Sequence, residues 1–220
     1  MLAAGILIGI ALGPALAGLS VTAPTAAPLI GARTLFGAPA STRRIVLVTV
    51  LSAVTLGLIG TAIGPAPELP AFLWLGAIGV VLAVVDVEHH RLPDRLVLPS
   101  YVVTDLALLV AATVTDDFTP WLRSLAGMAA VFGVLFGLAM ISPSGLGFGD
   151  VKLGGLLGLH LGWLGWDYVV LGIVLGFVVG AVASLALIAV RRASLRTHLA
   201  FGPALLAGTL VAILAGPALR

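Results

Sequence analysis

The sequence predicts an all-α protein, a polytopic membrane helix bundle of about eight transmembrane helices, and three observations support this prediction. Of its 220 residues, 60% are hydrophobic and only 9% are charged, whereas a soluble domain carries about 25% charged residues. The apolar residues form eight runs, most of them near the ~20 residues that cross a bilayer core. The basic residues lie in short loops between these runs, which indicates contact with a lipid bilayer and no nucleic-acid partner.

The eight apolar runs are the predicted helices, in chain order. They are Leu2–Leu19, Ile45–Ile63, Pro70–Val85, Leu96–Val114, Leu125–Ser142, Val151–Leu164, Tyr168–Val190 and Leu199–Leu219. The first run has no Lys or Arg before Arg33, so it lacks the positive start of a signal peptide and is expected to be retained. The sixth run is short and is expected to be tilted or half embedded, so a count of seven spans stays open.

The chain is expected to be a single integral membrane domain over residues 1–220. Residues 20–44 form its longest loop, rich in Ala, Pro, Thr and Gly, and we expect a flexible cytoplasmic connector there. Small residues recur at helical spacing, which allows helices to pack backbone to backbone. They are Gly133 with Gly137, Gly154 with Gly158, and Gly172 with Gly176 and Gly180.

The loop charges predict the orientation in the membrane. With the N-terminus outside and eight crossings, nine of the eleven basic residues fall on the cytoplasmic side, as the positive-inside rule requires. These nine are Arg33, Arg43, Arg44, Arg91, Arg95, Lys152, Arg191, Arg192 and Arg196, while Arg123 and Arg220 fall outside. Removing one crossing from the second half would spoil this asymmetry, which favours eight spans over seven.

Two carboxylates are expected at the same membrane face. Asp86 ends the third run, and Asp150 opens the sixth, behind Gly147 and Gly149. The two runs between them cross out and back, so both side chains fall on the cytoplasmic side. Such a pair can share one proton, so that the ionised Asp activates a water and the protonated Asp polarises a peptide carbonyl. Taken alone, Asp150 fits a helix N-cap equally well.

Three motifs follow one another in the chain. After Asp86 comes Arg91-Leu92-Pro93-Asp94-Arg95-Leu96-Val97-Leu98-Pro99; next comes Gly147-Phe148-Gly149-Asp150-Val151-Lys152-Leu153, and then Ala200-Phe201-Gly202-Pro203. In this order they resemble the motifs of the prepilin leader peptidase family, membrane aspartic proteases with a GxGD signature. Val97 replaces the usual Thr, and Ala200 replaces the usual Pro. The resemblance covers roughly residues 70–220, the expected peptidase core.

The resemblance implies a function. It implies an aspartic endopeptidase of the prokaryotic cytoplasmic membrane, with Asp86 and Asp150 as its dyad. The implied substrate is a prepilin or pilin-like protein of type IV or Tad/Flp pili and protein secretion, which loses a short basic leader at the cytoplasmic face. Gly147 and Gly149 are expected to leave room for an extended substrate. Motif support or substrate binding is expected from Glu88, Pro93, Asp94, Lys152, Phe201, Gly202 and Pro203, with Asp94 also capping the fourth helix.

The chain departs from the fuller members of that family in one respect. Many of them carry a cytoplasmic domain with two CxxC pairs for zinc, whereas this chain has no cysteine and resembles a minimal form. No metal and no cofactor are expected for cleavage. S-adenosylmethionine is expected only if the family's N-methyltransferase activity is retained, and the absence of the zinc-binding region argues against that.

One function from another class stays open. A proton-coupled small-solute transporter would use Asp86, Asp105 and Asp150 as a relay, although the chain has none of the internal repeats of many transporters. Otherwise Asp105 is expected to form a hydrogen bond between helices. Lys152 is expected to reach toward lipid headgroups. The sequence does not identify the pilin, the residue after the scissile bond, or the oligomeric state.

Overall fold

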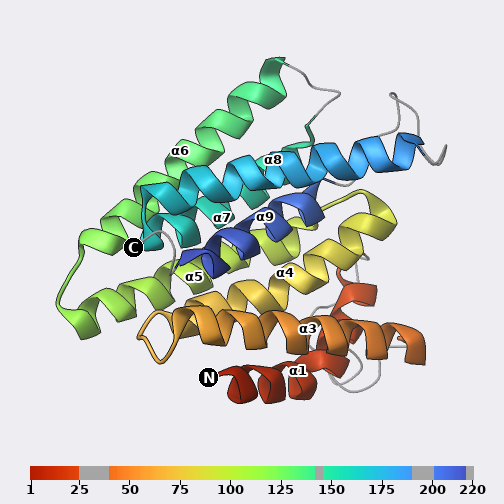
Figure 1. The fold of residues 1–220 in the computed structure, drawn as a ribbon, viewed down its shortest axis with the longest axis horizontal. Helices are drawn as coiled ribbons and strands as arrows, with labels where there is room; N and C mark the ends of the chain where they lie inside the picture. The colour runs from red at the N-terminus through yellow and green to blue at the C-terminus, as the bar shows by residue number, and fades with distance from the viewer. Residues whose placement is uncertain (25–39, 142–145, 190–200, 217–220) are drawn as a thin grey trace. The chain divides into compact units, whose positions relative to one another are not determined.

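The computed structural model of the chain describes residues 1–24, 40–141, 146–189 and 201–216. In these ranges it contains eight α-helices and no strand (Figure 1), so the predicted all-α fold is confirmed. The helices are α1 (Leu2–Thr22), α3 (Thr42–Ile63), α4 (Leu69–His89), α5 (Asp94–Thr115), α6 (Thr119–Ile141), α7 (Phe148–Leu164), α8 (Trp166–Ala189) and α9 (Gly202–Leu214). Each falls on one predicted run.

Some predictions fall on residues outside the described ranges. They concern most of the 20–44 connector with Arg33, the start of the last run at Leu199, and the basic residues Arg191, Arg192, Arg196 and Arg220. The orientation that these charges predict therefore stays a prediction.

Six of the described helices are long and apolar enough to cross a membrane, namely α1, α3, α4, α5, α6 and α8. The chain is accordingly a multi-pass membrane protein. Helix α7 has 17 residues, about 26 Å at 1.5 Å per residue, less than the roughly 30 Å of a hydrocarbon core. This agrees with the prediction of a short sixth run. Helix α9 is shorter still, with 13 residues.

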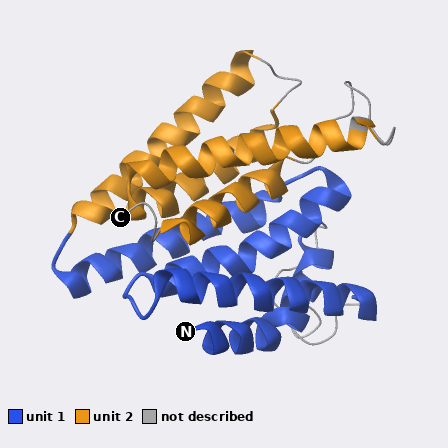
Figure 2. Cartoon of the chain, in the orientation of Figure 1, with its two compact units in different colours: residues 1–117 blue, residues 118–220 orange. Residues whose placement is uncertain are grey.

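The chain divides into two compact units, residues 1–117 and 118–220 (Figure 2). In the first unit, α4 packs against each of the other three helices, and 12 of its 21 residues are buried. Helices α1 and α3 meet at their backbones, because a Cβ on Gly9 would lie only 2.5 Å from the Cα of Ala53. Close approach of this kind is the use of small residues in membrane helices.

In the second unit, α7 packs against α6, α8 and α9, and 12 of its 17 residues are buried. A Cβ on Gly158 would lie 2.5 Å from the carbonyl oxygen of Gly127 in α6. Arg123 of α6 holds the C-terminal end of α7. Its guanidinium donates hydrogen bonds to the carbonyls of Gly162 (2.7 Å) and Trp163 in the last turn of that helix. These contacts satisfy carbonyls that the end of a helix leaves without partners.

The predicted glycine contacts are confirmed for two of the three sets. Gly154 and Gly158 pack on α6. Gly176 and Gly180 of α8 face α9, and Gly172 contacts both α7 and α9. At the closest point a Cβ on Gly208 would lie 2.2 Å from the nitrogen of Gly176. The prediction is wrong for the third set, because a Cβ on Gly133 or Gly137 would meet no described atom within 4 Å. Their spacing is helical, but no residue that the structure describes packs against that face of α6.

Candidate active site

Asp86 is a buried carboxylate in the last turn of α4, with 4% of its surface exposed. The helix ends soon after it, because His90 adopts the left-handed conformation (φ 52°) and donates its backbone N–H to the backbone carbonyl of Asp86 at 2.8 Å. A left-handed residue at this position is a common way to end a helix. The carboxylate therefore lies at the helix end where the macrodipole gives no support to negative charge.

Asp150 lies at the opposite kind of helix end. It is the third residue of α7 and is half-buried. Its Oδ2 accepts a hydrogen bond from the backbone N–H of Gly147, the N-cap residue, at 3.3 Å. The predicted capping role is thus present in modified form, since Asp150 reaches back to the N-cap instead of occupying it. The macrodipole favours a negative charge here.

Gly147 keeps space open beside this carboxylate. Its backbone is extended (φ −73°, ψ 148°), so its conformation does not require glycine. A Cβ at this position would, however, lie 3.3 Å from Oδ2 of Asp150. The absence of a side chain therefore leaves one side of the Asp150 carboxylate uncovered.

Asp86 and Asp150 belong to different compact units. Each unit positions one carboxylate at the end of its central helix, Asp86 at the C-terminal end of α4 and Asp150 at the N-terminal end of α7. The dyad is therefore a prediction about how the two units meet, and it remains a prediction.

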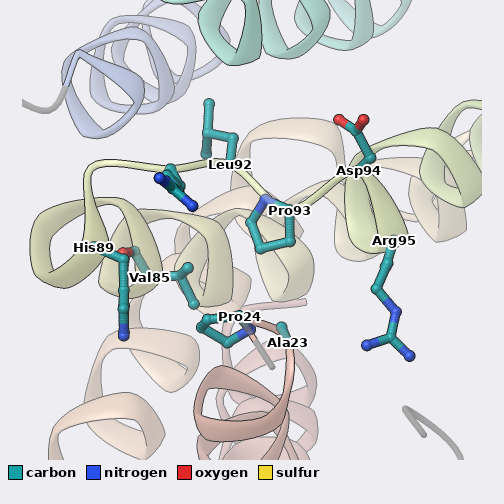
Figure 3. Close-up of a pocket in the computed structure, with 9 residues that line it drawn as sticks. Ala23, Pro24, Val85, His89, Leu92, Pro93, Asp94 and Arg95 are labelled. Carbon is teal, nitrogen blue, oxygen red and sulfur yellow. The ribbon is translucent and has the colours of Figure 1, made fainter. Parts of the chain in front are cut away.

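The loop between α4 and α5 borders a pocket of about 710 Å³ (Figure 3). Its walls come from the end of α1, the end of α4, the loop itself and the start of α5. Pro93 is the N-cap of α5 and Asp94 is its first residue, so the expectation that Asp94 caps this helix is wrong by one position. Its negative charge in the first turn still suits the helix dipole.

Glu88 forms an ion pair with Arg44, which joins the end of α4 to the start of α3. The sequence predicts motif support or substrate binding for Glu88 and, for Arg44, only a place on the cytoplasmic side. Opposite charges near the same end of two consecutive spans were the signal that could have revealed the pair. Glu88 therefore has a partner within the first unit, and its role toward a substrate stays a prediction.

Phe148, the variable residue of the Gly-Phe-Gly-Asp motif, belongs to an aromatic cluster that the sequence did not predict. Its ring centroid lies 6.5 Å from that of Phe132 and 6.3 Å from that of Phe136, both in α6 and both edge-on to it. The ammonium of Lys152 lies 4.8 Å from the centroid of the same ring. Such geometry is a cation–π contact. The four-residue spacing of the two α6 phenylalanines was the available signal.

The third motif packs α9 against α8. Phe201 is the N-cap of α9, and Gly202 and Pro203 are its first two residues. The Phe201 ring lies 5.0 Å from the ring of Phe177, centroid to centroid. A Cβ on Gly180 would lie 2.6 Å from an atom of the Phe201 ring. These residues thus stabilise the second unit.

Asp105 lies in α5 and is half-buried. Within the described ranges, no group of three or more His, Asp or Glu side chains could hold a metal ion.

Comparison with known proteins gives a family match. The model of the type IV leader peptidase family matches residues 72–185, just over half of the chain. Three similar relatives are named prepilin leader peptidase/N-methyltransferase. The one from Stutzerimonas stutzeri is 32% identical over 142 residues, covering 62% of this chain and 46% of the relative. No solved structure matches.

The other two relatives are similar at greater length. The protein from Bacillus subtilis (strain 168) is 30% identical over 158 residues, covering 71% of this chain and 60% of the relative. The protein from Pseudomonas aeruginosa PAO1 is 30% identical over 185 residues, covering 79% and 59%. The chain therefore spans about half the length of these relatives.

Proposed function

Because the chain belongs to the type IV leader peptidase family, we propose that it is an aspartic endopeptidase of the prokaryotic cytoplasmic membrane. It cleaves the short basic leader from a prepilin or pilin-like protein at the cytoplasmic face. Asp86 and Asp150 are its catalytic residues. Both lie inside the segment that the family model matches.

The observation that supports this proposal most is the path of the chain between the two carboxylates. Asp86 is in the last turn of α4 and Asp150 in the first turn of α7. Between them lie α5 and α6, with 22 and 23 residues, about 33 to 35 Å each. Since each is long enough to cross the bilayer, two crossings return the chain to the side on which it started.

The two helix ends suit different steps of peptide hydrolysis. Asp150, at a helix N-terminus that stabilises negative charge, acts as the base and takes a proton from water. The resulting hydroxide attacks the scissile carbonyl, while the buried Asp86 donates a hydrogen bond to the carbonyl oxygen. Collapse of the tetrahedral intermediate breaks the carbon–nitrogen bond, and the leaving amine takes up a proton from the dyad.

The relatives' name includes a second activity, methyl transfer, whose methyl donor would be S-adenosylmethionine. The pocket at the end of α4 does not suit this molecule, because Arg91 and Arg95 line it and would repel a sulfonium cation. Cleavage needs only the dyad and water.

The proposal is tested by co-expressing the chain with a prepilin-like substrate and following the loss of the leader by mass. D86A and D150A are expected to abolish cleavage, whereas D105N and D167N remove acidic groups outside the dyad and leave cleavage intact. Normal processing by either dyad variant would overturn the assignment. The transporter alternative would instead require a proton or solute flux in proteoliposomes that D105N removes; the family match favours the peptidase.

A further inference from the structure

The pocket beside the α4–α5 loop has the size and walls of a ligand site. Its volume of about 710 Å³ lies within the roughly 300–1,000 Å³ typical of small-molecule pockets. One wall is apolar, built from Ala23 and Pro24 at the end of α1 and from Val85 and Leu92. All of these residues belong to the first unit, so the pocket is a property of that unit alone.

The charges around this pocket are mainly positive. Two arginines line it, Arg91 and Arg95, against one carboxylate, Asp94. Figure 3 shows His89 and Arg95 extending toward the side on which Ala23 and Pro24 lie, whereas the Asp94 carboxylate points to the opposite side. The nearby Glu88 does not offset these charges, because it is paired with Arg44. A basic leader peptide is therefore an unsuitable occupant.

The chemistry of the lining favours a phosphate group. Guanidinium groups bind phosphate oxygens through paired N–H donors. The first turn of α5 also borders the pocket, but Asp94 already places a negative charge there, so the two arginines are the phosphate-binding groups. The volume exceeds what a phosphate ion alone needs, and the apolar wall suits the glycerol and upper acyl carbons of a lipid.

We infer that this pocket binds a phosphate group, with the headgroup of an anionic phospholipid as the expected source. Basic pockets between membrane helices on the cytoplasmic side are known to take such headgroups. Binding at this pocket involves the first unit only and does not require peptidase activity. A lipid bound there would join the end of α1 to the α4–α5 loop, next to the helix turn that holds Asp86.

The test uses the purified full-length chain in detergent, titrated with phosphatidylglycerol or phosphatidylcholine and analysed by native mass spectrometry. The wild type is expected to bind phosphatidylglycerol more tightly. Losing each arginine should weaken this binding about fivefold, so R91Q/R95Q should lose nearly all of the preference. R43Q is the matched control, because Arg43 is exposed at the start of the neighbouring α3 and does not line the pocket.

A second arm separates the two sources of phosphate. Inorganic phosphate is titrated alone by calorimetry and then added to the phosphatidylglycerol complex. If it does not bind or displace the lipid, the lipid headgroup is the ligand; if it binds and displaces the lipid, the site holds but free phosphate can fill it. Should R91Q/R95Q not fold, as judged by circular dichroism, R95Q alone applies the same test.

Two results would overturn the inference. Equal losses in R43Q and R91Q/R95Q would mean that lipid responds only to the general charge of this end of the unit. A wild type that prefers neither phosphatidylglycerol nor inorganic phosphate would mean that the pocket is not a phosphate site.

Discussion

The two units of the molecule place an acidic residue at opposite ends of their central helices. Each has a central, largely buried helix, α4 in the first and α7 in the second. In the first unit the acidic residue comes at the C-terminal end of that helix and is buried; in the second it comes at the N-terminal end and is half-buried. Asp86 thus lacks the helix-end support for negative charge that Asp150 receives.

This difference teaches that two identical side chains need not be interchangeable. A dyad requires one carboxylate that holds a proton and one that accepts a proton, and in the dyad that we propose the contrasting helix ends would supply this asymmetry before any substrate arrives.

The two isosteric substitutions should differ in severity. D150N removes the base, and we expect leader cleavage to fall by about 10³- to 10⁴-fold, the upper range for general acid–base catalysis. D86N keeps a hydrogen-bond donor for the carbonyl oxygen, so we expect a loss nearer 10²-fold. Initial rates on a purified substrate measure both. Equal losses, or a larger loss in D86N, would remove the assigned roles.

Overpacking should disrupt the second unit at the contact of α6 with α7. G158L would force a side chain against the carbonyl of Gly127, 2.5 Å from the Cβ position, and a backbone atom cannot move aside. We expect a loss of about 1–3 kcal/mol or more in the free energy of unfolding. Thermal unfolding in detergent measures this, with G133L as control, because a Cβ at that position meets no described atom within 4 Å. The first unit should respond similarly to G9L. Equal stability of G158L and G133L would contradict the packing of α6 against α7.

Removing the Phe148 ring should have a moderate effect that is confined to the second unit. F148A deletes two edge-on ring contacts and the cation–π contact to Lys152. We expect a loss of about 1–2 kcal/mol in the free energy of unfolding, and F148L should lie between F148A and the wild type. If both variants unfold like the wild type, the aromatic cluster does not stabilise the start of α7.

The smallest effect is expected at the Arg44–Glu88 ion pair of the first unit. Its partners are 19% and 40% exposed, so solvent screens the pair and its contribution is about 0–1 kcal/mol. We expect R44E to lower leader cleavage slightly and R44E/E88R to restore it. Cleavage that stays low after the charge swap would mean that Glu88 contacts the substrate directly.

The helices could be predicted well from the sequence because one requirement decides them, namely that backbone groups in a bilayer are hydrogen-bonded within the protein. Because the backbone has to satisfy its own hydrogen bonds, an apolar run becomes a helix whatever its neighbours are, and all eight runs coincide with helices. Contacts between helices were harder to predict. The Arg44–Glu88 pair, the Phe148 cluster and the lack of a described neighbour at Gly133 all depend on which helix lies opposite, and spacing within one helix does not contain that information. The position of Asp94 after Pro93 was missed by one residue for a local reason, because proline took the N-cap place.

The central claim is that the two central helices bring Asp86 and Asp150 together, and the chain offers a direct measurement of it. Since the sequence contains no cysteine, D86C/D150C would carry the only two thiols. Oxidation in membranes, or a short thiol-reactive linker, should join them, because a disulfide forms when Cα atoms come within about 7 Å. D86C/D167C is the matched control, with its second thiol at the start of α8, beyond the far end of α7. Rapid cross-linking of D86C/D150C alone is the result we predict; cross-linking that is absent, or equal in the control, would contradict the dyad.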